Sequence, residues 1–186
     1  MENLHIERGS FISLNNSRSS QYNKSNSLKT QKICHAFRIS HIYKNIYIGD
    51  NLNSNNIDEL CKLNIKAILH LGTYKKHDNI LELYKKSDIN YNFLEINYDN
   101  NFDISKCFDP AWVYMNNTSC NILIQCNQGI SRSPIIVAYF LTRKLYEKGK
   151  CKSGQLVVDD ILTLIKINRP CSNPNKIFIK QLKNYE

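Results

Sequence analysis

Hydrophobic and polar positions divide the chain into a polar first segment and a patterned remainder. Residues 1–36 are rich in Ser, Asn, Gln and Lys and show little apolar periodicity. A segment of that composition cannot bury enough apolar surface to offset the entropy lost on ordering. We therefore predict a basic, mostly disordered tail over residues 1–36 and one folded domain over residues 37–186.

Beyond the tail, short apolar runs alternate with longer segments of helical period. The apolar runs predict strands at residues 46–50, 66–72, 91–96 and 121–125. The helical periods predict helices at residues 56–63, 79–86, 103–115, 134–149, 157–167 and 175–182. Strands that alternate with helices favour an α/β fold, with a sheet covered by helices on both faces.

Two prolines occupy different positions in the predicted helices. Pro134 fits the first turn of its helix, where the missing backbone N–H is not needed. Pro110 falls inside the helix that Asp103 is predicted to cap, so we expect a kink there.

Composition limits the class of protein. With 186 residues and 42% hydrophobic content, the chain suits one globular domain with a sizeable core. No apolar run has the length that crossing a bilayer requires, so we expect no membrane partner. The seven cysteines include no Cys-x-x-Cys pair, so no metal and no other cofactor is expected. Their odd number fits a disulfide scaffold poorly, and we expect a reducing compartment: the cytoplasm, with the nucleus as a second candidate.

The net charge of +9 comes mainly from lysine and has two interpretations. One is a solvated basic surface without a specific role. The other is attraction to acidic partners or phosphorylated ligands. No nucleic-acid partner is expected.

The strongest chemical signal lies between the strand at 121–125 and the helix that follows. Cys126 is separated by five residues from Arg132, and Pro134 opens the helix. A strand, a short loop and a helix N-terminus form a cradle for an anion, and Arg132 adds a planar clamp for phosphate oxygens. The same positive field favours a thiolate nucleophile at Cys126, and Ser133 is placed to help that thiolate leave. The predicted substrate-binding residues are Asn127, Gln128, Gly129, Ile130, Ser131 and Arg132.

The Cys-x5-Arg spacing is by itself a weak signal. The alternative is a buried cysteine beside a surface arginine. The preceding strand, the glycine that permits close approach of a ligand, and the helix-starting proline together favour the phosphate cradle.

With this loop and its flanking elements, the chain resembles the cysteine-based dual-specificity protein phosphatases. The loop from Cys126 to Ser133 is similar to theirs, and the resemblance covers most of residues 40–186. Further similar segments are Ile46-Tyr47-Ile48-Gly49, Leu63 to Leu69, Asn168-Arg169-Pro170, Pro174-Asn175, and Phe178 with Gln181 and Leu182. The resemblance implies a central, mostly parallel sheet and hydrolysis of phosphotyrosine, phosphoserine and phosphothreonine through a phosphocysteine, without a metal. Phosphoproteins are then the expected partners, with protein kinases as further candidates.

Two departures from the family pattern bear on activity. Gln125 stands where the family usually has a histidine that helps to order the loop and favour the thiolate. An uncharged amide does this less well, which keeps open a catalytically weak, phosphopeptide-binding pseudophosphatase. Arg132 is the only basic residue of the loop, which favours protein substrates over glucan, phosphoinositide or RNA phosphates.

The departing oxygen also needs a proton. In the family, an aspartate after a strand like Phe93 to Ile96 is the acid, and a second aspartate begins a helix. When this family pattern is carried over to the chain, it makes Asp99 the acid and Asp103 the cap of the following helix. The loop between the two aspartates is one residue shorter here than in common members of the family. Two alternatives stay open. In one, Asp103 is the acid, and in the other, both aspartates are solvated loop carboxylates. Asn175 either braces the phosphate-binding loop or simply caps its own helix.

Overall fold

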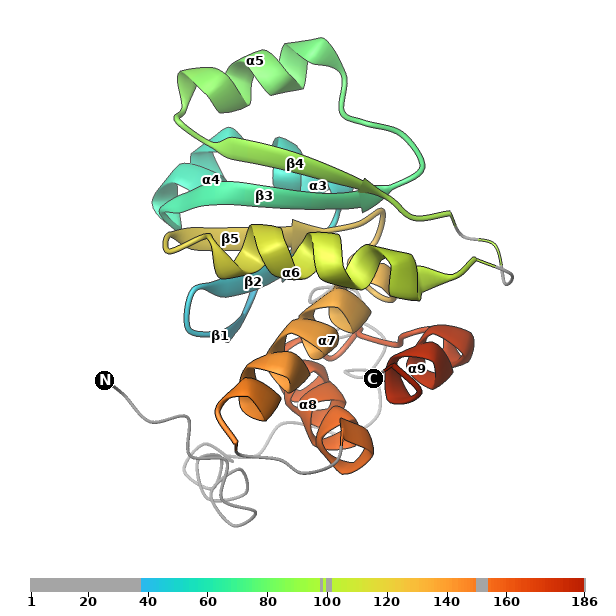
Figure 1. The fold of residues 1–186 in the computed structure, drawn as a ribbon. Helices are drawn as coiled ribbons and strands as arrows, with labels where there is room; N and C mark the ends of the chain where they lie inside the picture. The colour runs from blue at the N-terminus through green and yellow to red at the C-terminus, as the bar shows by residue number, and fades with distance from the viewer. Residues whose placement is uncertain (1–37, 98, 100–101, 150–153, 186) are drawn as a thin grey trace, which may run out of the picture.

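The structure is a computed structural model that describes residues 38–97, 99, 102–149 and 154–185. It is an α/β fold in which one five-stranded sheet lies between two groups of helices (Figure 1). The predicted fold class is therefore confirmed. The tail predicted over residues 1–36 lies outside the described residues, and the division into tail and domain stays a prediction.

The sheet is mostly parallel, and its strands run in the order β1-β2-β5-β3-β4. Only β1 and β2 pair in antiparallel fashion. The strands are β1 (Ser40–Tyr43), β2 (Ile46–Gly49), β3 (Ile65–Gly72), β4 (Asn90–Glu95) and β5 (Asn121–Gln125). Because β2, β3, β4 and β5 run in the same direction, their carboxyl ends meet at one edge of the sheet.

Four of these strands match predicted apolar runs, whereas β1 was not predicted. Its four residues include only one buried side chain, Ile42, so the period-2 signal is too short to detect. The chain returns from β1 to β2 through Lys44, which has a φ of 50°. Tertiary pairing with β2, and not an apolar pattern, makes β1 a strand.

Three helices cover one face of the sheet: α3 (Asn51–Asn55), α4 (Ile57–Lys62) and α5 (Asp78–Lys86). Their smaller core joins Leu60 of α4 and Tyr84 of α5 to Ile68 of β3 and Leu123 of β5. The short helix α3 was not predicted. It begins at a capping box in which Asp50 and Asn53 each accept from the other's backbone N–H.

The opposite face carries the larger core and the remaining helices (Figure 1). These are the 3-10 helix η1 (Ile104–Cys107), α6 (Phe108–Asn116), α7 (Arg132–Glu147), α8 (Gly154–Asn168) and α9 (Lys176–Lys183). Leu69 of β3 and Ile124 of β5 point into this core, alternating with the residues that face α4 and α5. The central strands are consequently buried on both faces, which explains their unbroken apolar runs.

The predicted helix over residues 103–115 is two elements, and Pro110 does not lie inside the one that Asp103 caps. Asp103 does cap a helix, but that helix is η1, and α6 starts afresh at Phe108. Pro110 is thus the third residue of α6, where a helix has no partner for the backbone N–H. A proline in that place begins a helix and does not bend one.

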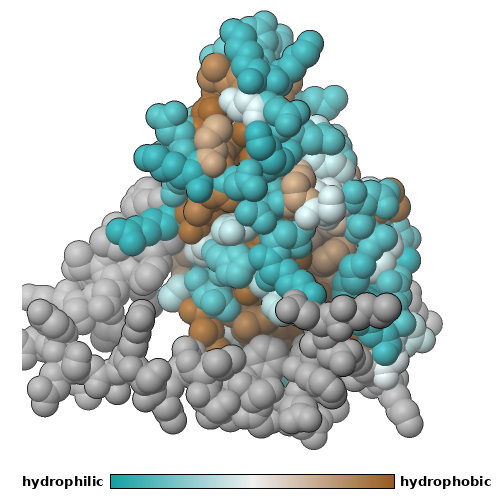
Figure 2. Space-filling model, turned by 90° about the vertical axis from the view of Figure 1, so that its left-hand side faces the viewer, coloured by the Kyte–Doolittle hydropathy of each residue, from teal (hydrophilic) through white to brown (hydrophobic). Residues whose placement is uncertain are grey.

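The amino edge of the sheet, away from the carboxyl ends, has a mainly hydrophilic surface with small scattered hydrophobic areas (Figure 2). Isolated apolar side chains of this kind are normal on a protein surface. Within the described ranges, no helix has both the length and the apolar character needed to cross a membrane.

Candidate active site

The central strand β5 delivers Cys126 to the carboxyl edge of the sheet. It lies between β2 and β3, and its last four residues are buried. Cys126 follows directly, and α7 begins six residues later at Arg132. The predicted strand–loop–helix arrangement is therefore present, and we call residues 126–131 the phosphate loop.

The phosphate loop wraps around the sulfur of Cys126. The thiol side chain is buried, and its Sγ accepts the backbone N–H of Gly129 at 3.2 Å. Gly129 has a φ of +64°, which a residue with a side chain rarely adopts. A Cβ at this position would meet the Gly49 carbonyl oxygen at 2.5 Å. Glycine is thus required both by conformation and by space.

Four consecutive carbonyl groups of the phosphate loop are bonded to donors outside it. Each carbonyl oxygen from Asn127 to Ile130 accepts a hydrogen bond from outside the loop. The donors are, in order, Asn51 N at 3.2 Å, Arg169 Nη2 at 3.2 Å, Arg169 Nε at 2.7 Å and Asn173 N at 2.8 Å. In a planar trans peptide the N–H points away from the C=O, so the N–H groups of residues 128–131 point away from these outside donors, and that of Gly129 reaches Sγ. An inward ring of N–H donors is the cradle that an anion needs.

Arg169 holds the phosphate loop in place, and the sequence alone assigned it no role. Its side chain is fully buried directly after α8. Besides the two loop carbonyls, it donates to the carbonyl oxygens of Arg38 (2.8 Å) and Ile48 (3.4 Å) and to Ser40 Oγ (3.1 Å). It therefore ties the phosphate loop to β1 and β2. The only signal in the sequence was its place in the family-like Asn168-Arg169-Pro170 segment.

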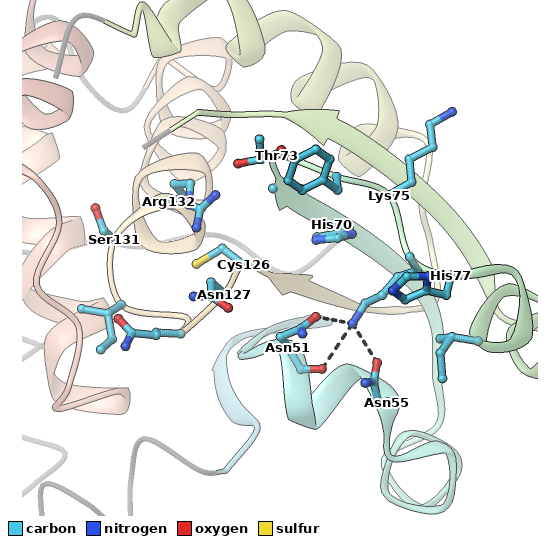
Figure 3. A pocket seen from close by; sticks show the side chains of 16 residues that line it. Asn51, Asn55, His70, Thr73, Lys75, His77, Cys126, Asn127, Ser131 and Arg132 are labelled. Carbon is cyan, nitrogen blue, oxygen red and sulfur yellow. Dashed lines mark hydrogen bonds between the residues drawn. The ribbon is translucent and has the colours of Figure 1, made fainter. Parts of the chain in front are cut away.

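Arg132 is the first residue of α7 and lies against the Cys126 side chain. Figure 3 shows its guanidinium directed toward the thiol. The side chain is almost buried, and Nη1 donates to the Ile96 carbonyl oxygen at 3.0 Å. This bond joins the phosphate loop to the chain that leaves β4, three residues before Asp99.

Two buried polar side chains close to Cys126 in the sequence have no hydrogen-bond partner in the part of the chain that the structure describes. Within the described residues, Ser133 Oγ and both amide atoms of Gln125 lack a hydrogen-bond partner. The hydrogen bond expected between Ser133 and Cys126 is therefore not formed in this structure. Gln125 faces the side of α3 to α5, like Leu123, and lies opposite His70 of β3 and Gly49 of β2 in the strand register.

A pocket of about 670 Å³ opens above the phosphate loop. Its far wall is formed by the end of β3 and by residues 72–77, which lead to α5. Nitrogen-bearing side chains dominate this wall and the loop, as Figure 3 shows for most of them. The basic ones among them are His70, Lys75, Lys76, His77 and Arg132. No carboxylate lines the pocket among the described residues, so the pocket is suited to an anionic ligand.

His70 and Lys76 are joined through Tyr91 on this wall. The Tyr91 hydroxyl accepts the backbone N–H of Lys76 at 3.1 Å and lies 2.7 Å from His70 Nδ1. Burial, with the positive charges of Lys76 and Arg132, lowers the pKa of His70 from 6.5 to about 4. The imidazole is therefore neutral at pH 7 and adds no charge to the pocket.

The ammonium group of Lys76 is held by α3. Nζ donates to the Asn51 carbonyl oxygen (3.2 Å), to Asn51 Oδ1 and to Asn55 Oδ1 (2.7 Å), as drawn in Figure 3. Burial lowers the pKa of Lys76 to about 8, and the negative charge of Asp50 opposes this shift. Lys76 thus anchors the far wall of the pocket to the unpredicted helix α3.

The two candidates for the general acid, Asp99 and Asp103, differ in their hydrogen bonds. Asp103 accepts from Ser105 N (3.2 Å) and from Ser105 Oγ (2.6 Å) as the cap of η1. The hydrogen bond from the Ser105 hydroxyl is the main cause that lowers the pKa of Asp103. A carboxyl with a lowered pKa is a poor proton donor. Asp99 is exposed in the loop between β4 and η1, and its carbonyl oxygen accepts the Phe102 N–H at 3.0 Å.

Asn175 does both of the things proposed for it. Its Oδ1 caps α9 by accepting the Ile177 N–H at 2.8 Å. Its backbone N–H donates to Ser131 Oγ at 2.9 Å, which braces the end of the phosphate loop.

The cysteines and the acidic side chains show no second centre in the described part of the chain. All the described cysteines, at positions 61, 107, 120, 126 and 171, are free thiols. Across the described ranges, no group of three or more His, Cys, Asp and Glu side chains is arranged to hold a metal ion.

Known proteins are similar to this chain in sequence and in fold. The chain is 33% identical over 156 residues to a probable dual specificity protein phosphatase of Dictyostelium discoideum, covering 76% of this chain and 61% of that relative. It is 27% identical over 149 residues to dual specificity protein phosphatase 9 of Homo sapiens, covering 78% and 35%. The chain thus matches only part of the length of these curated relatives.

The structural and family comparisons agree with the sequence relatives. The Yvh1 phosphatase domain from Chaetomium thermophilum has a TM-score of 0.66 at 19% identity, covering 78% of this chain and 94% of that one. At this identity the likeness shows the fold. The family model of the dual specificity phosphatase catalytic domain matches residues 46–186, well over half of the chain. The chain with this phosphate loop therefore belongs to the dual specificity phosphatase family.

Proposed function

We propose that the protein is a cysteine-dependent phosphatase that hydrolyses phosphotyrosine and phosphoserine or phosphothreonine in proteins. The observation that carries this proposal is the phosphate loop, in which the carbonyls of residues 127–130 are bonded to donors outside the loop and the Gly129 N–H donates to Cys126 Sγ. Such a loop supplies donors for phosphate oxygens around a nucleophile before any substrate arrives. Preorganised donors of this kind stabilise the charge that develops in the transition state.

The reaction proceeds in two displacements. The Cys126 thiolate attacks phosphorus, and the bond from phosphorus to the leaving oxygen breaks while a proton passes to that oxygen. Arg132 and the inward N–H groups hold the three equatorial oxygens. Water then attacks the phosphocysteine and gives its proton to the acid, now acting as a base, while the phosphorus–sulfur bond breaks and releases inorganic phosphate and the Cys126 thiolate.

Asp99 is the proposed acid. It lies three residues beyond Ile96, whose carbonyl is bonded to Arg132, so its loop leaves the sheet beside the phosphate loop. Asp103 is occupied as a helix cap and has a lowered pKa, which supports Asp99 over Asp103.

Protein phosphates are the proposed substrate class. Among the residues of the phosphate loop and the start of α7, Arg132 is the one cation, whereas the further cations line the distant wall. A single clamp suits one phosphomonoester, and the distant cations suit a negatively charged surrounding segment.

The test measures turnover of phenyl phosphate, whose leaving oxygen needs a proton, by purified wild type, Cys126→Ser, Asp99→Ala and Asp103→Ala. We expect no turnover by Cys126→Ser, and a kcat about 100-fold or more lower in Asp99→Ala, the scale of a lost general acid. Asp103→Ala should keep its kcat and lose about 1 kcal/mol of stability with its cap.

Two results would contradict the proposal. Full activity in Cys126→Ser would remove the covalent mechanism. Tight phosphopeptide binding by the wild type without hydrolysis would show a binding module in place of an enzyme. A phosphopeptide panel captured by Cys126→Ser then separates a Tyr preference from a Ser or Thr preference.

A further inference from the structure

The side-chain amide of Gln181 contacts the loop that carries the proposed acid. On α9, Gln181 Oε1 accepts the backbone N–H of Ile104 at 2.8 Å, and Nε2 donates to the carbonyl oxygen of Phe102 at 3.1 Å. Asp103 lies between these two bonded residues. The two bonds use both ends of the amide, so they fix the orientation of the loop as well as its distance from α9.

Phe102 passes this restraint on to Asp99. The N–H of Phe102 donates to the Asp99 carbonyl oxygen at 3.0 Å, while its C=O accepts from Gln181. One residue thereby links the turn that begins at Asp99 to α9. On the other side of Asp99, Ile96 is held by Arg132 Nη1 at 3.0 Å and by the Gly72 carbonyl at 2.9 Å.

The opposite end of α9 holds the phosphate loop. Asn175, the N-cap of α9, donates its N–H to Ser131 Oγ at 2.9 Å, and Asn173 donates to the Ile130 carbonyl oxygen at 2.8 Å. The helix itself is fixed in the core by Phe178 and Leu182, one turn apart and both buried. At 1.5 Å per residue, the six steps from Asn175 to Gln181 span roughly 9 Å.

We propose that Gln181 is a positioning residue for the general acid, and that α9 sets the distance between the Asp99 turn and the Cys126 thiolate. The proposal rests on the proposed function, in which Asp99 protonates the leaving oxygen. Phosphorus is held by the phosphate loop, and the leaving oxygen must meet the acid within hydrogen-bond reach. A rigid element bonded to both loops is a direct way to keep that geometry.

The choice of substrate separates positioning of an acid from general structural damage. A phenyl phosphate needs a proton on its leaving oxygen, whereas an aryl phosphate with a strongly acidic phenol leaves without one. We expect Gln181→Met to lower kcat/KM about tenfold on phenyl phosphate and less than about twofold on the activated ester. Asp99→Ala should show the same substrate dependence with a larger loss.

Combining the variants makes the test specific to Asp99. In the Asp99→Ala background, Gln181→Met should cause less than about a twofold further loss, because the group that it positions is gone. Gln181→Glu keeps the acceptor for Ile104 and loses the donor to Phe102, so its loss on phenyl phosphate should be intermediate. Lys180→Met changes the exposed neighbour on α9 and should leave both substrates unaffected.

Two patterns would overturn the proposal. Equal losses on both esters in Gln181→Met, while Asp99→Ala remains substrate-dependent, would show that Gln181 only stabilises the fold. Equal losses on both esters in Asp99→Ala would show that Asp99 is not the general acid, and the proposed role of Gln181 would fail with it. The test of the nucleophile with Cys126→Ser does not depend on this result.

Discussion

Arg169 donates from Nε to the carbonyl oxygen of Gly129 at 2.7 Å, from a position 40 residues further along the chain. This buried bond, with the neighbouring one to Gln128, turns the peptide groups of the phosphate loop so that their N–H groups face Cys126. The anion-binding geometry is therefore held from outside the loop, by a side chain that does not line the pocket.

Arg169→Lys should disrupt the loop although the charge is retained. Lysine cannot reproduce the planar fork that reaches Gly129, Gln128 and β1 together. We expect the free energy of unfolding, measured by urea denaturation, to fall by about 2–4 kcal/mol. The kcat/KM for an aryl phosphate should fall roughly 100-fold. The inhibition constant of inorganic phosphate should rise in parallel, because the N–H cradle is altered.

The matched control for this variant is Arg143→Lys. Arg143 pairs with Asp109 at 2.6 Å in a half-exposed position away from the pocket. Its replacement should cost less than about 1 kcal/mol and leave phosphate inhibition unchanged. Equal effects of the two variants on phosphate inhibition would refute the bracing role of Arg169.

Two glycines with positive φ offer a second comparison. Gly129→Ala must place a Cβ 2.5 Å from the Gly49 carbonyl oxygen, whereas a Cβ on Gly149 would meet nothing within 4 Å. Both changes carry the left-handed backbone penalty of about 1–2 kcal/mol. Only Gly129→Ala should add a steric cost, which raises its total loss of stability to about 3 kcal/mol or more. It should also abolish turnover. Thermal unfolding and aryl phosphate assays check this, and equal destabilisation would contradict it.

Gln125→Met should raise stability. The amide of Gln125 is fully buried, and both of its polar atoms lack a partner within the described residues. An unbonded buried polar group costs about 1–3 kcal/mol, which a methionine of similar length does not incur. We expect a gain of about 1 kcal/mol in urea unfolding. Gln181→Met removes an amide with two bonds and should lose stability, so a loss in both variants would show that Gln125 is bonded after all.

His70 should make the fold sensitive to mild acid. Burial is the main cause that lowers its pKa from 6.5 to about 4. Between these values the unfolded chain takes up a proton and the folded protein does not, so stability falls as the pH drops from 6.5 to 4. His70→Asn keeps an acceptor for the Tyr91 hydroxyl and cannot titrate.

The measurement for His70 is urea unfolding at pH 7 and at pH 4.5. We expect the wild type to lose roughly 2 kcal/mol more than His70→Asn over this interval. The same loss in both proteins would place the acid sensitivity on other groups.

The sequence alone determined the elements around the nucleophile. The apolar run at residues 121–125, the glycine and the helix-starting proline are local features, and each has a local physical meaning. A buried parallel strand needs an apolar run, a left-handed residue favours glycine, and a helix start accepts proline. The strand, loop and helix at Cys126 could therefore be predicted, and so could Asp103 as a cap, because its partner Ser105 is two residues away.

Only the tertiary structure decided how the site is held. The side chains of Arg169, Gln181 and Lys76 have partners 21 to 131 residues away in the chain, and β1 is a strand because it pairs with β2. Hydrogen bonds across such separations depend on which segments the fold brings together, and a linear pattern carries no information about that. The sequence thus specified Cys126 and its loop, whereas the packing of α8 and α9 against the sheet fixed how the loop is held and the place of the Asp99 turn.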